Sequence, residues 1–446
     1  MKLNKITINS KEALADHIKS GKASYYYSSA TSTVIPYDKI ESYLSHLDGD
    51  DLFWVNLSTM PEEMELDDSG VLTISGPVTW QSAKQYCRSK GRDIMTSPTE
   101  ELASVLSGLA TSATGERCFG FGTLRDQVEQ IEYCSDKGEF ILLNSSREIE
   151  ESEALRRYRE TYSRYIDFKN APFPRMLNET DQLIGTEGQL GVVTQAKIRT
   201  TTFDERTFIF IKLPRWEQEM IAHLEVFEKV QSFRDRIFSC ELLDFNSMKN
   251  LPEQEKVTSE GDIIFLEVKT KSFEAIYDEL LSSLIHIREE DIFEVSASRC
   301  NQLRMNVPRY TFEMNLKMGV VKKGTDVQVS VQDFPTLLEF YREWTRLGID
   351  YNLFGHFGDG HLHFNFLPTA VQVDQCQEKL VELYDFISEL GGSPFAEHGI
   401  GLIKQKFITN FWEEAQYNFF SELKRKMDPK NIFFPLGFLS LKRTNS

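Results

Sequence analysis

The sequence of 446 residues has few cysteines, and none of them are paired in a recognisable motif. No two of its six cysteines show the two-residue spacing found in zinc ribbons, iron–sulfur clusters and thioredoxin-like sites. That absence disfavours all three kinds of site. Scattered thiols in a chain of this length are typical of a reducing cytoplasm, so we expect a cytoplasmic protein without a disulfide framework.

Positive charge and long apolar runs are also scarce. The formal net charge is −18, and nucleic-acid binding needs basic surface to displace counterions from phosphates, so we expect no nucleic-acid partner. No run of about 18 apolar residues occurs, and the first residues lack the apolar core of a secretory signal. We therefore expect no membrane span. An anionic substrate needs a local positive group inside this negative field.

The composition that is present, 41% hydrophobic and 26% charged, is that of an ordinary globular protein, and the length suggests two or three domains. Patterning predicts a first α+β region, with strands over 5–8, 52–57, 71–75, 138–143 and 191–200 and helices over 11–19, 79–90 and 99–109. A second region has strands expected over 205–212, 261–268 and 326–331 and helices over 215–233, 272–288 and 333–347. These units suggest an open sheet with helices on one face. Helices are expected over 371–390 and 397–427 at the end of the chain.

Histidines are concentrated near the C-terminus, in the segment FGHFGDGHLHFNF at residues 354–366. Its glycines predict a tight turn at 358–360, after which His361, His363 and Asn365 alternate and share one face of a strand. His356 lies before the turn and can fold back toward that face. Two imidazoles with a carboxylate make a divalent site of the zinc or manganese type.

A carboxylate of the required kind lies in SPFAEHGIG at residues 393–401. Glu397 can complete the metal shell, while its neighbour His398 points differently and can act as a base. A lone histidine is ordinarily a packing or surface residue. Three histidines punctuated by glycine, joined by a separate Glu-His-Gly, favour a functional site instead.

Two further segments are rich in small residues. In LIGTEGQLGVVT, residues 183–194, three glycines allow the backbone to approach a ligand before a strand begins, although a plain hairpin fits equally well. The segment SGLATSATGERCFGFG, residues 107–122, can line a cofactor groove. Neither segment is specific by itself.

Together these segments resemble the FAD-linked oxidase family, of the vanillyl-alcohol oxidase or PCMH-type fold, in the branch of D-lactate, glycolate and D-2-hydroxyglutarate dehydrogenases. IGTEGQLGVVT is similar to the family's IGSEGTLGIIT, FGHFGDGHLHFN is similar to GHxGDGNLHxN, and EHGIG is the same. Weaker similarities lie in GVLTISGPVTW, FGFGTLRDQVEQIE and MDPKNIFFP. The resemblance covers nearly the whole chain in the family's order.

The resemblance implies an α+β fold with three parts. These are a PCMH-type FAD-binding domain over 1–201, an α+β substrate or cap domain with an antiparallel sheet and the metal motif over 202–390, and a helical segment over 391–446 that packs back on the first domain. It implies FAD and a divalent metal as cofactors. The implied FAD-binding residues are Ser29, Ala30, Thr31, Ser32, Pro98, Gly108, Ser112, Gly115, Glu187, Gly188, Gly191 and Val192.

The family's site residues transfer to matching positions. His356, His363 and Glu397 are implied to bind the metal, and His398 is implied to be the catalytic base. Asn365 is implied to support the substrate, which is a small D-2-hydroxy acid of the lactate, glycolate or 2-hydroxyglutarate type. The expected reaction produces the 2-oxo acid and passes electrons to an external quinone, cytochrome or electron-transfer flavoprotein. We expect a homodimer.

Arg304, in the segment QLRMNVP at residues 302–308, matches the family's substrate-binding arginine. A planar guanidinium can pair with a carboxylate through two parallel hydrogen bonds, which suits the recognition of a hydroxy acid.

The chain departs from the family's pattern at several positions. The family's first pyrophosphate loop, RGGGTS, corresponds to YSSATS at residues 27–32, which has no glycine, so a position that needs positive φ is expected to be strained. The motif TIGG is reduced to VLSG at 105–108, and NPG becomes FPL at 434–436. Lys323 is the nearest candidate for a family lysine before the strand expected at 326–331. His361 replaces an Asn and can either join the metal shell or line the pocket.

Three alternatives follow from these departures. An alkylglycerone-phosphate-synthase-like flavoenzyme shares GHxGDG but has HHG where this chain has Glu397-His-Gly. A non-catalytic member that lacks FAD and acts as a binding module is suggested by the glycine-free loop at 28–32. A metal hydrolase using His356, His363 and Glu397 explains the C-terminal cluster but leaves IGTEGQLG without a role.

Overall fold

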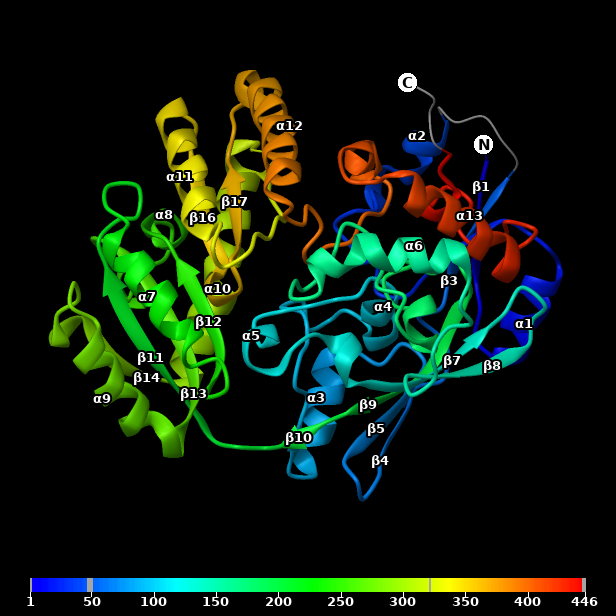
Figure 1. The fold of residues 1–446 in the computed structure, drawn as a ribbon, viewed down its shortest axis with the longest axis horizontal. Helices are drawn as coiled ribbons and strands as arrows, with labels where there is room; N and C mark the ends of the chain where they lie inside the picture. The colour runs from blue at the N-terminus through cyan, green and yellow to red at the C-terminus, as the bar shows by residue number, and fades with distance from the viewer. Residues whose placement is uncertain (1, 46–50, 321, 443–446) are drawn as a thin grey trace. The chain divides into compact units, whose positions relative to one another are not determined.

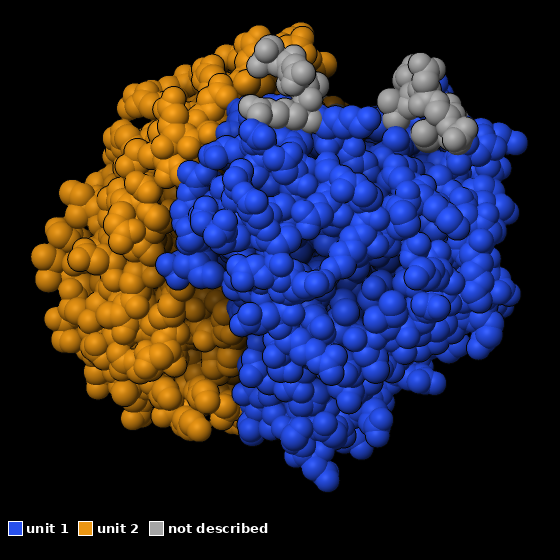
Figure 2. Space-filling model, turned by 45° about the vertical axis from the view of Figure 1, so that its right-hand side comes forward, with its two compact units in different colours: residues 1–115, 123–203, 395–446 blue, residues 116–122, 204–394 orange. Residues whose placement is uncertain are grey.

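The structure is a computed structural model that describes residues 2–45, 51–320 and 322–442 (Figure 1). It contains two compact units, coloured separately in Figure 2. Unit 1 consists of residues 1–115, 123–203 and 395–446, and unit 2 consists of residues 116–122 and 204–394. Among the described residues, none of the helices combines the length and hydropathy that crossing a bilayer requires.

Unit 1 contains two main sheets. The first is parallel, in the order β1 (Leu3–Thr7), β3 (Leu52–Asn56) and β2 (Ser24–Tyr27). The second is antiparallel, in the order β4 (Glu63–Leu66), β5 (Val71–Ser75), β9 (Val192–Arg199), β7 (Val128–Cys134) and β8 (Phe140–Asn144). A short pair joins β6 (Arg92–Asp93) to β10 (Thr201–Thr202).

Four helices of unit 1 begin at residues with capping side chains. Ser10, Thr79, Ser104 and Ser152 each accept a hydrogen bond from a backbone N–H of the first turn that follows, which satisfies a donor the helix leaves unpaired. The helices of this unit are α1 (Lys11–Lys19), α2 (Ile40–Ser45), α3 (Trp80–Ser89), α4 (Val105–Ala110), α6 (Glu153–Tyr162) and α13 (Glu414–Met427).

The C-terminal residues complete the core of unit 1. The Ser24 N–H donates to the Ile432 carbonyl at 2.8 Å, and the Phe434 N–H donates to the Ser24 carbonyl at 2.7 Å. Ile432 packs in the apolar cluster of α1 and β3, and Phe434 packs in the neighbouring cluster of Tyr25 and Trp54. Residues from both ends of the chain therefore share the same two apolar clusters.

Unit 2 is built on a seven-stranded antiparallel sheet. Its order is β14 (Ile292–Ser296), β11 (Arg206–Leu213), β13 (Asp262–Lys269), β12 (Ile237–Leu243), β16 (Tyr351–His356), β17 (His361–Phe366) and β15 (Lys323–Gly324). Its helices are α5 (Cys118–Phe121), α7 (Ile221–Gln231), α8 (Phe245–Met248), α9 (Phe273–Ser283), α10 (Ala297–Met318), α11 (Phe334–Trp344) and α12 (Val373–Leu390).

The expected α+β fold with an antiparallel sheet in the second region is confirmed, but the prediction of helices on one face only is wrong. Every residue of β13 except the last is buried, so both faces of this strand are covered. Phe210 and Phe265 pack with Leu303 of α10 on one face, while Ile209 and Ile211, whose side chains point the other way, are also buried.

Three predicted elements differ from the structure. Residues 326–331 form no strand, because Gln328 makes only isolated bridges to His361 and Ser393. The helix expected over 397–427 begins only at Glu414, since Gly399 and Gly401 adopt positive φ and a 3-10 helix follows over Gln405–Asn410. The helix expected over 99–109 is limited to α4.

Candidate functional site

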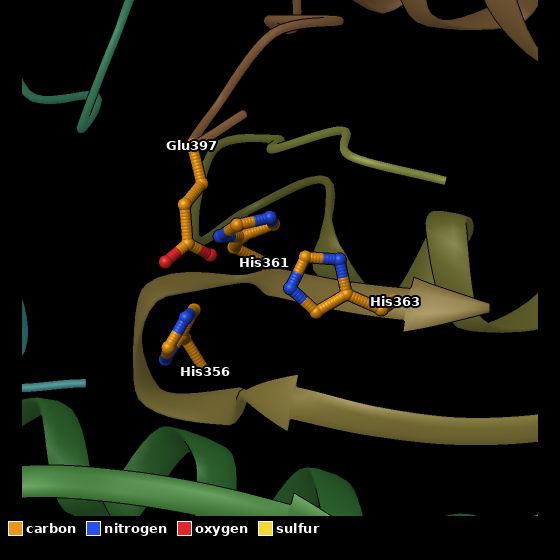
Figure 3. A group of neighbouring side chains, drawn as sticks. All are labelled: His356, His361, His363 and Glu397. Atoms are coloured by element: carbon orange, nitrogen blue, oxygen red, sulfur yellow. The ribbon is translucent and has the colours of Figure 1, made fainter. Parts of the chain in front are cut away.

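Three histidines of unit 2 converge on one face of the hairpin formed by β16 and β17 (Figure 3). His356 lies directly opposite His361 in the strand register, and His363 follows two residues later on the same face. Gly360, with φ of 65°, lies in the tight turn between the strands. Each histidine offers a ring nitrogen within 4.8 Å of those of the other two.

An oxygen atom lies beside each of these buried imidazoles. His356 Nδ1 is 3.0 Å from Glu241 Oε1, His363 Nδ1 is 3.0 Å from the Thr325 carbonyl oxygen, and His361 Nε2 is 3.3 Å from Asp326 Oδ1. Such acceptors fix the orientation and tautomer of metal-binding histidines. The donor set and its surrounding oxygens therefore fit a zinc-type ion.

Asn365 lies on the same strand face but is held inside the sheet. Its Nδ2 donates to Asn352 Oδ1 at 2.9 Å and to the His363 carbonyl at 3.3 Å, and the residue is buried. A side chain at Gly324 would meet Asn365 Oδ1 at 2.4 Å, so this glycine is required for the close approach of β15.

Arg304, the predicted carboxylate-binding residue, lies on α10 and is partly exposed. Its guanidinium is paired with the Glu116 carboxylate of the same unit. The structure thus shows that this arginine can hold a carboxylate, and that an internal one already lies against it.

A cavity lies within unit 1. Three of the predicted cofactor residues, Gly188, Gly191 and Val192, line it together with Ser28 and Ser107. The remaining lining residues are Leu14, Tyr26, Tyr27, Leu57, Met60, Gly76, Pro77, Ser104, Leu106, Ala110, Leu183, Val193 and Thr194. Its mixture of apolar surface and hydroxyl groups suits a small-molecule cofactor.

The cavity wall carries backbone and hydroxyl groups of the kind that bind the phosphates of a dinucleotide such as FAD. Gly188, with φ of 72°, has open space where a Cβ would lie, so its backbone can be approached closely. The hydroxyls of Ser28 and Ser107 are 3.0 Å apart at the wall. None of the lining residues is basic, so a diphosphate here would depend on backbone N–H groups and hydroxyls.

The glycine-free loop retains the backbone conformation that glycine would favour. Ala30 has φ of 54°, which places a non-glycine residue in the left-handed region, as the sequence suggested for some position of this loop. Ser29, Thr31 and Ser32 flank it and do not line the cavity, whereas Ser28 does.

The other predicted cofactor residues serve packing and hydrogen bonding beside the cavity. A Cβ at Gly108 would lie 3.0 Å from Trp80, and one at Gly115 would lie 2.0 Å from the Ser97 carbonyl, next to Pro98. Ser112, with φ of 52°, is buried and accepts from the Arg125 guanidinium while donating to Asn170 Oδ1 at 2.7 Å.

The loop that carries Glu397 and His398 is anchored at both ends within unit 1. On one side, Asn170 Nδ2 donates to the Ala396 carbonyl at 2.9 Å. On the other side, Glu187 Oε1 accepts from the Ile400 N–H at 2.7 Å, and Oε2 accepts from the Gly401 N–H at 2.9 Å. Burial raises the pKa of Glu187 to about 7. Glu187 therefore connects the cavity-lining glycine Gly188 to the His398 loop.

Sequence reasoning missed Glu241, Arg125 and Asn170. Glu241 had one usable signal, because a glutamate within the apolar run IFSCELL is rare in a buried strand without a partner. Arg125 and Asn170 could not be recognised from neighbouring residues, because their contacts are with residues far away in the sequence. Asn170, for example, donates a hydrogen bond to the carbonyl of Ala396.

Two family models match this chain. Residues 205–436 match the family model "FAD linked oxidases, C-terminal domain", and residues 28–144 match "FAD binding domain". The structure is similar to that of an alkyldihydroxyacetonephosphate synthase, with a TM-score of 0.67 and 13% identity over 97% of this chain and 75% of the other. At this identity the likeness shows the fold.

Three curated relatives are similar over most of this chain. D-lactate dehydrogenase of Archaeoglobus fulgidus is 24% identical, over 84% of this chain and 78% of its own length. Mitochondrial D-lactate dehydrogenase (cytochrome) of Kluyveromyces lactis is 23% identical over 82% of this chain, which spans 61% of that protein. Mitochondrial D-2-hydroxyglutarate dehydrogenase of Danio rerio is 23% identical, over 85% of this chain and 69% of its own length. Because one family model covers more than half of its residues, this chain belongs to the FAD-linked oxidase family.

Proposed function

We propose that this protein is an FAD-dependent, metal-assisted dehydrogenase that oxidises a small D-2-hydroxy acid to the 2-oxo acid. The names of the relatives, D-lactate and D-2-hydroxyglutarate dehydrogenases, support this substrate class. The observation that carries the proposal is the connection made by Glu187. Through it, one short segment contributes both the wall of the cofactor cavity and the anchor of the loop bearing His398.

FAD and a divalent ion would be held by different parts of the chain. Gly188, Gly191, Val192, Ser28 and Ser107 would hold the flavin cofactor, and His356 and His363 would hold the ion. When bound, FAD supplies the acceptor for the hydride at C2 of the substrate, and the ion supplies Lewis acidity that favours the deprotonated 2-hydroxyl.

Chain connectivity supports Glu397 as a further ligand. Gln328 bridges both His361 and Ser393 within unit 2. Glu397 follows Ser393 by four residues, a span of at most about 14 Å for extended backbone. This short connection is why we propose Glu397 as the carboxylate ligand of the ion.

The remaining roles fall to residues of this chain with suitable chemistry. Arg304 binds the substrate carboxylate by exchanging its contact with Glu116, and Asn365 keeps the floor of the site in place through Asn352. His398 accepts the proton of the 2-hydroxyl, since imidazole is the side chain best suited to general-base catalysis near neutral pH. The electrons then leave to an external acceptor, and the cytochrome named for one relative supports a protein acceptor of that kind.

Anaerobic addition of D-lactate, D-2-hydroxyglutarate or glycolate to the purified protein tests the proposal. We expect a yellow protein whose flavin absorbance is bleached by at least one of these acids. His398→Gln should retain the flavin but be reduced about 10²–10⁴-fold more slowly, because a general base is lost. His286→Gln, at an exposed histidine of unit 2, is the matched control and should behave as the wild type.

Other outcomes would support the alternatives. A protein that stays colourless after reconstitution with FAD would contradict the proposal in favour of a non-catalytic member or a metal hydrolase. A yellow protein that none of the acids bleaches would favour a synthase-like flavoenzyme. Full reduction rates in His398→Gln would exclude His398 as the base.

A further inference from the structure

The histidine hairpin contains one imidazole more than the proposed function uses. His361 is completely buried and lies between the other two histidines in the sequence. Its ring centroid lies 5.2 Å from that of His356 and 4.7 Å from that of His363, while His356 and His363 are 6.0 Å apart. His361 is therefore nearer to each of the two than they are to one another.

The position of His361 is determined by the hairpin itself. Direct pairing of His356 with His361, together with strand alternation, turns all three rings to the same side of the sheet. Three basic rings buried side by side cannot all be protonated without strong repulsion, and burying polar groups together is costly unless something satisfies them. A cation bound among neutral imidazoles removes both difficulties.

A carboxylate backs His361 as another backs His356. Asp326 Oδ1 lies 3.3 Å from His361 Nε2, and both residues are almost inaccessible to solvent. The two atoms lie at ion-pair distance without hydrogen-bond geometry, so the carboxylate acts on the ring through its negative charge, which favours a cation bound to the imidazole. Each of the three histidines thus has its own supporting oxygen, from Glu241, Asp326 and Thr325.

We propose that His361 is a third histidine ligand of the divalent ion, supported by Asp326. The inference rests on the metal of the proposed function but not on its substrate or its flavin. Three neutral nitrogen donors within unit 2 make the site selective for borderline ions such as Zn²⁺ and Co²⁺ over the oxygen-preferring Mn²⁺. The ion should consequently bind with high affinity even when the Glu397 carboxylate is removed.

X-ray absorption spectroscopy of the zinc-loaded wild-type protein tests the ligand set without a mutation. After chelation and reloading with Zn²⁺ alone, the imidazole multiple-scattering signal should correspond to three histidines. A signal for two histidines would overturn the proposal. Since this measurement uses the intact chain, it does not depend on a variant's ability to fold.

Competition with a chromophoric chelator provides the second test. His361→Asn should weaken Zn²⁺ binding at least 10-fold and lower the ratio of Zn²⁺ to Mn²⁺ affinity, with a changed visible spectrum for bound Co²⁺. In Glu397→Gln the ratio of Zn²⁺ to Mn²⁺ affinity should remain close to that of the wild type. Wild-type affinity and an unchanged Co²⁺ spectrum in His361→Asn would show that His361 only lines the pocket. Failure of the proposed function would be seen separately, as a flavin that hydroxy acids do not bleach.

Discussion

Nδ1 of His356 lies 3.0 Å from Oε1 of Glu241, and both side chains are buried in unit 2. The two residues come from neighbouring strands, β16 and β12, so the sheet itself holds the carboxylate behind the ring. This contact fixes which nitrogen of His356 faces the proposed ion.

Replacing this carboxylate should weaken metal binding without removing a ligand. Glu241→Gln keeps the size of the side chain but removes its charge, and we expect Zn²⁺ affinity to fall about 10–100-fold. Isothermal titration of the chelated protein measures this change. The exposed Glu289→Gln removes the same charge from unit 2 and should leave affinity unchanged. Equal affinities in both variants would refute a role for Glu241.

Glu116 should compete with the substrate for Arg304. In Glu116→Gln the guanidinium loses its internal carboxylate partner, so KM for the hydroxy acid should fall by roughly 3–10-fold while kcat changes little, in line with about 1 kcal/mol for a partly exposed pair. Arg304→Ala should instead raise KM by roughly 10–100-fold, because a charge-assisted contact is lost. Steady-state kinetics with an artificial acceptor distinguish these effects. A higher KM in Glu116→Gln would mean that the pair orients Arg304 instead of competing for it.

The buried carboxyl of Glu187 should make stability depend on pH near neutrality. Its folded-state pKa is raised to about 7, so between about pH 4.5 and 7 the folded protein retains a proton that the unfolded chain releases. This stabilising contribution is present at low pH and is lost as pH rises through 7. Glu187→Gln lacks it, so the melting temperature of the variant relative to wild type should increase by a few degrees from pH 5 to 8.

The informative quantity is how the difference in melting temperature between Glu187→Gln and wild type changes with pH. The size of that difference at a single pH is less informative, because the glutamine amide also loses an acceptor for the Gly401 N–H. Glu63→Gln, at an exposed position of β4, is the control and should show no such slope. Parallel pH profiles for wild type and Glu187→Gln would contradict a raised pKa at this residue.

Ala30 should be a site where glycine stabilises the protein. A left-handed conformation costs a non-glycine residue about 1–2 kcal/mol, while glycine adds about 0.5–1 kcal/mol of chain entropy, so Ala30→Gly should stabilise by up to about 1 kcal/mol. Ala30→Val should be destabilising. Chemical denaturation and flavin retention both measure the effect. Ala103 has no positive φ, so Ala103→Gly should only destabilise the protein. If Ala30→Gly destabilised the protein to the same extent, backbone strain at Ala30 would be disproved.

Local patterns predicted the histidine hairpin well because a strand's period of two fixes which residues share a face. The turn glycines and the alternation of His361, His363 and Asn365 are readable from adjacent residues. The strain in the 27–32 loop was similarly local, and the structure places it at Ala30.

Partners distant in the sequence could not be predicted in this way. Arg304 and Glu116 are 188 residues apart, and His356 and Glu241 are 115 apart, so only tertiary packing brings them together. The helix expected from residue 397 failed for a different reason. Gly399 has φ of 79°, and a Cβ there would meet the Glu187 carboxylate. The tertiary contact with Glu187 therefore determines the conformation of this loop, and the local helix propensity does not.

The return of residues 395–446 to unit 1 has a consequence for how the chain is made. During synthesis from the N-terminus, all of unit 2 leaves the ribosome before Ile432 and Phe434 become available to fill the apolar clusters around α1, β2 and β3. The nascent first unit must therefore keep apolar surface exposed until residues 432–434 have been synthesised, a stage at which chaperone binding would protect it from aggregation. A chain that ends before residue 432 would lack the side chains that complete these two clusters of unit 1.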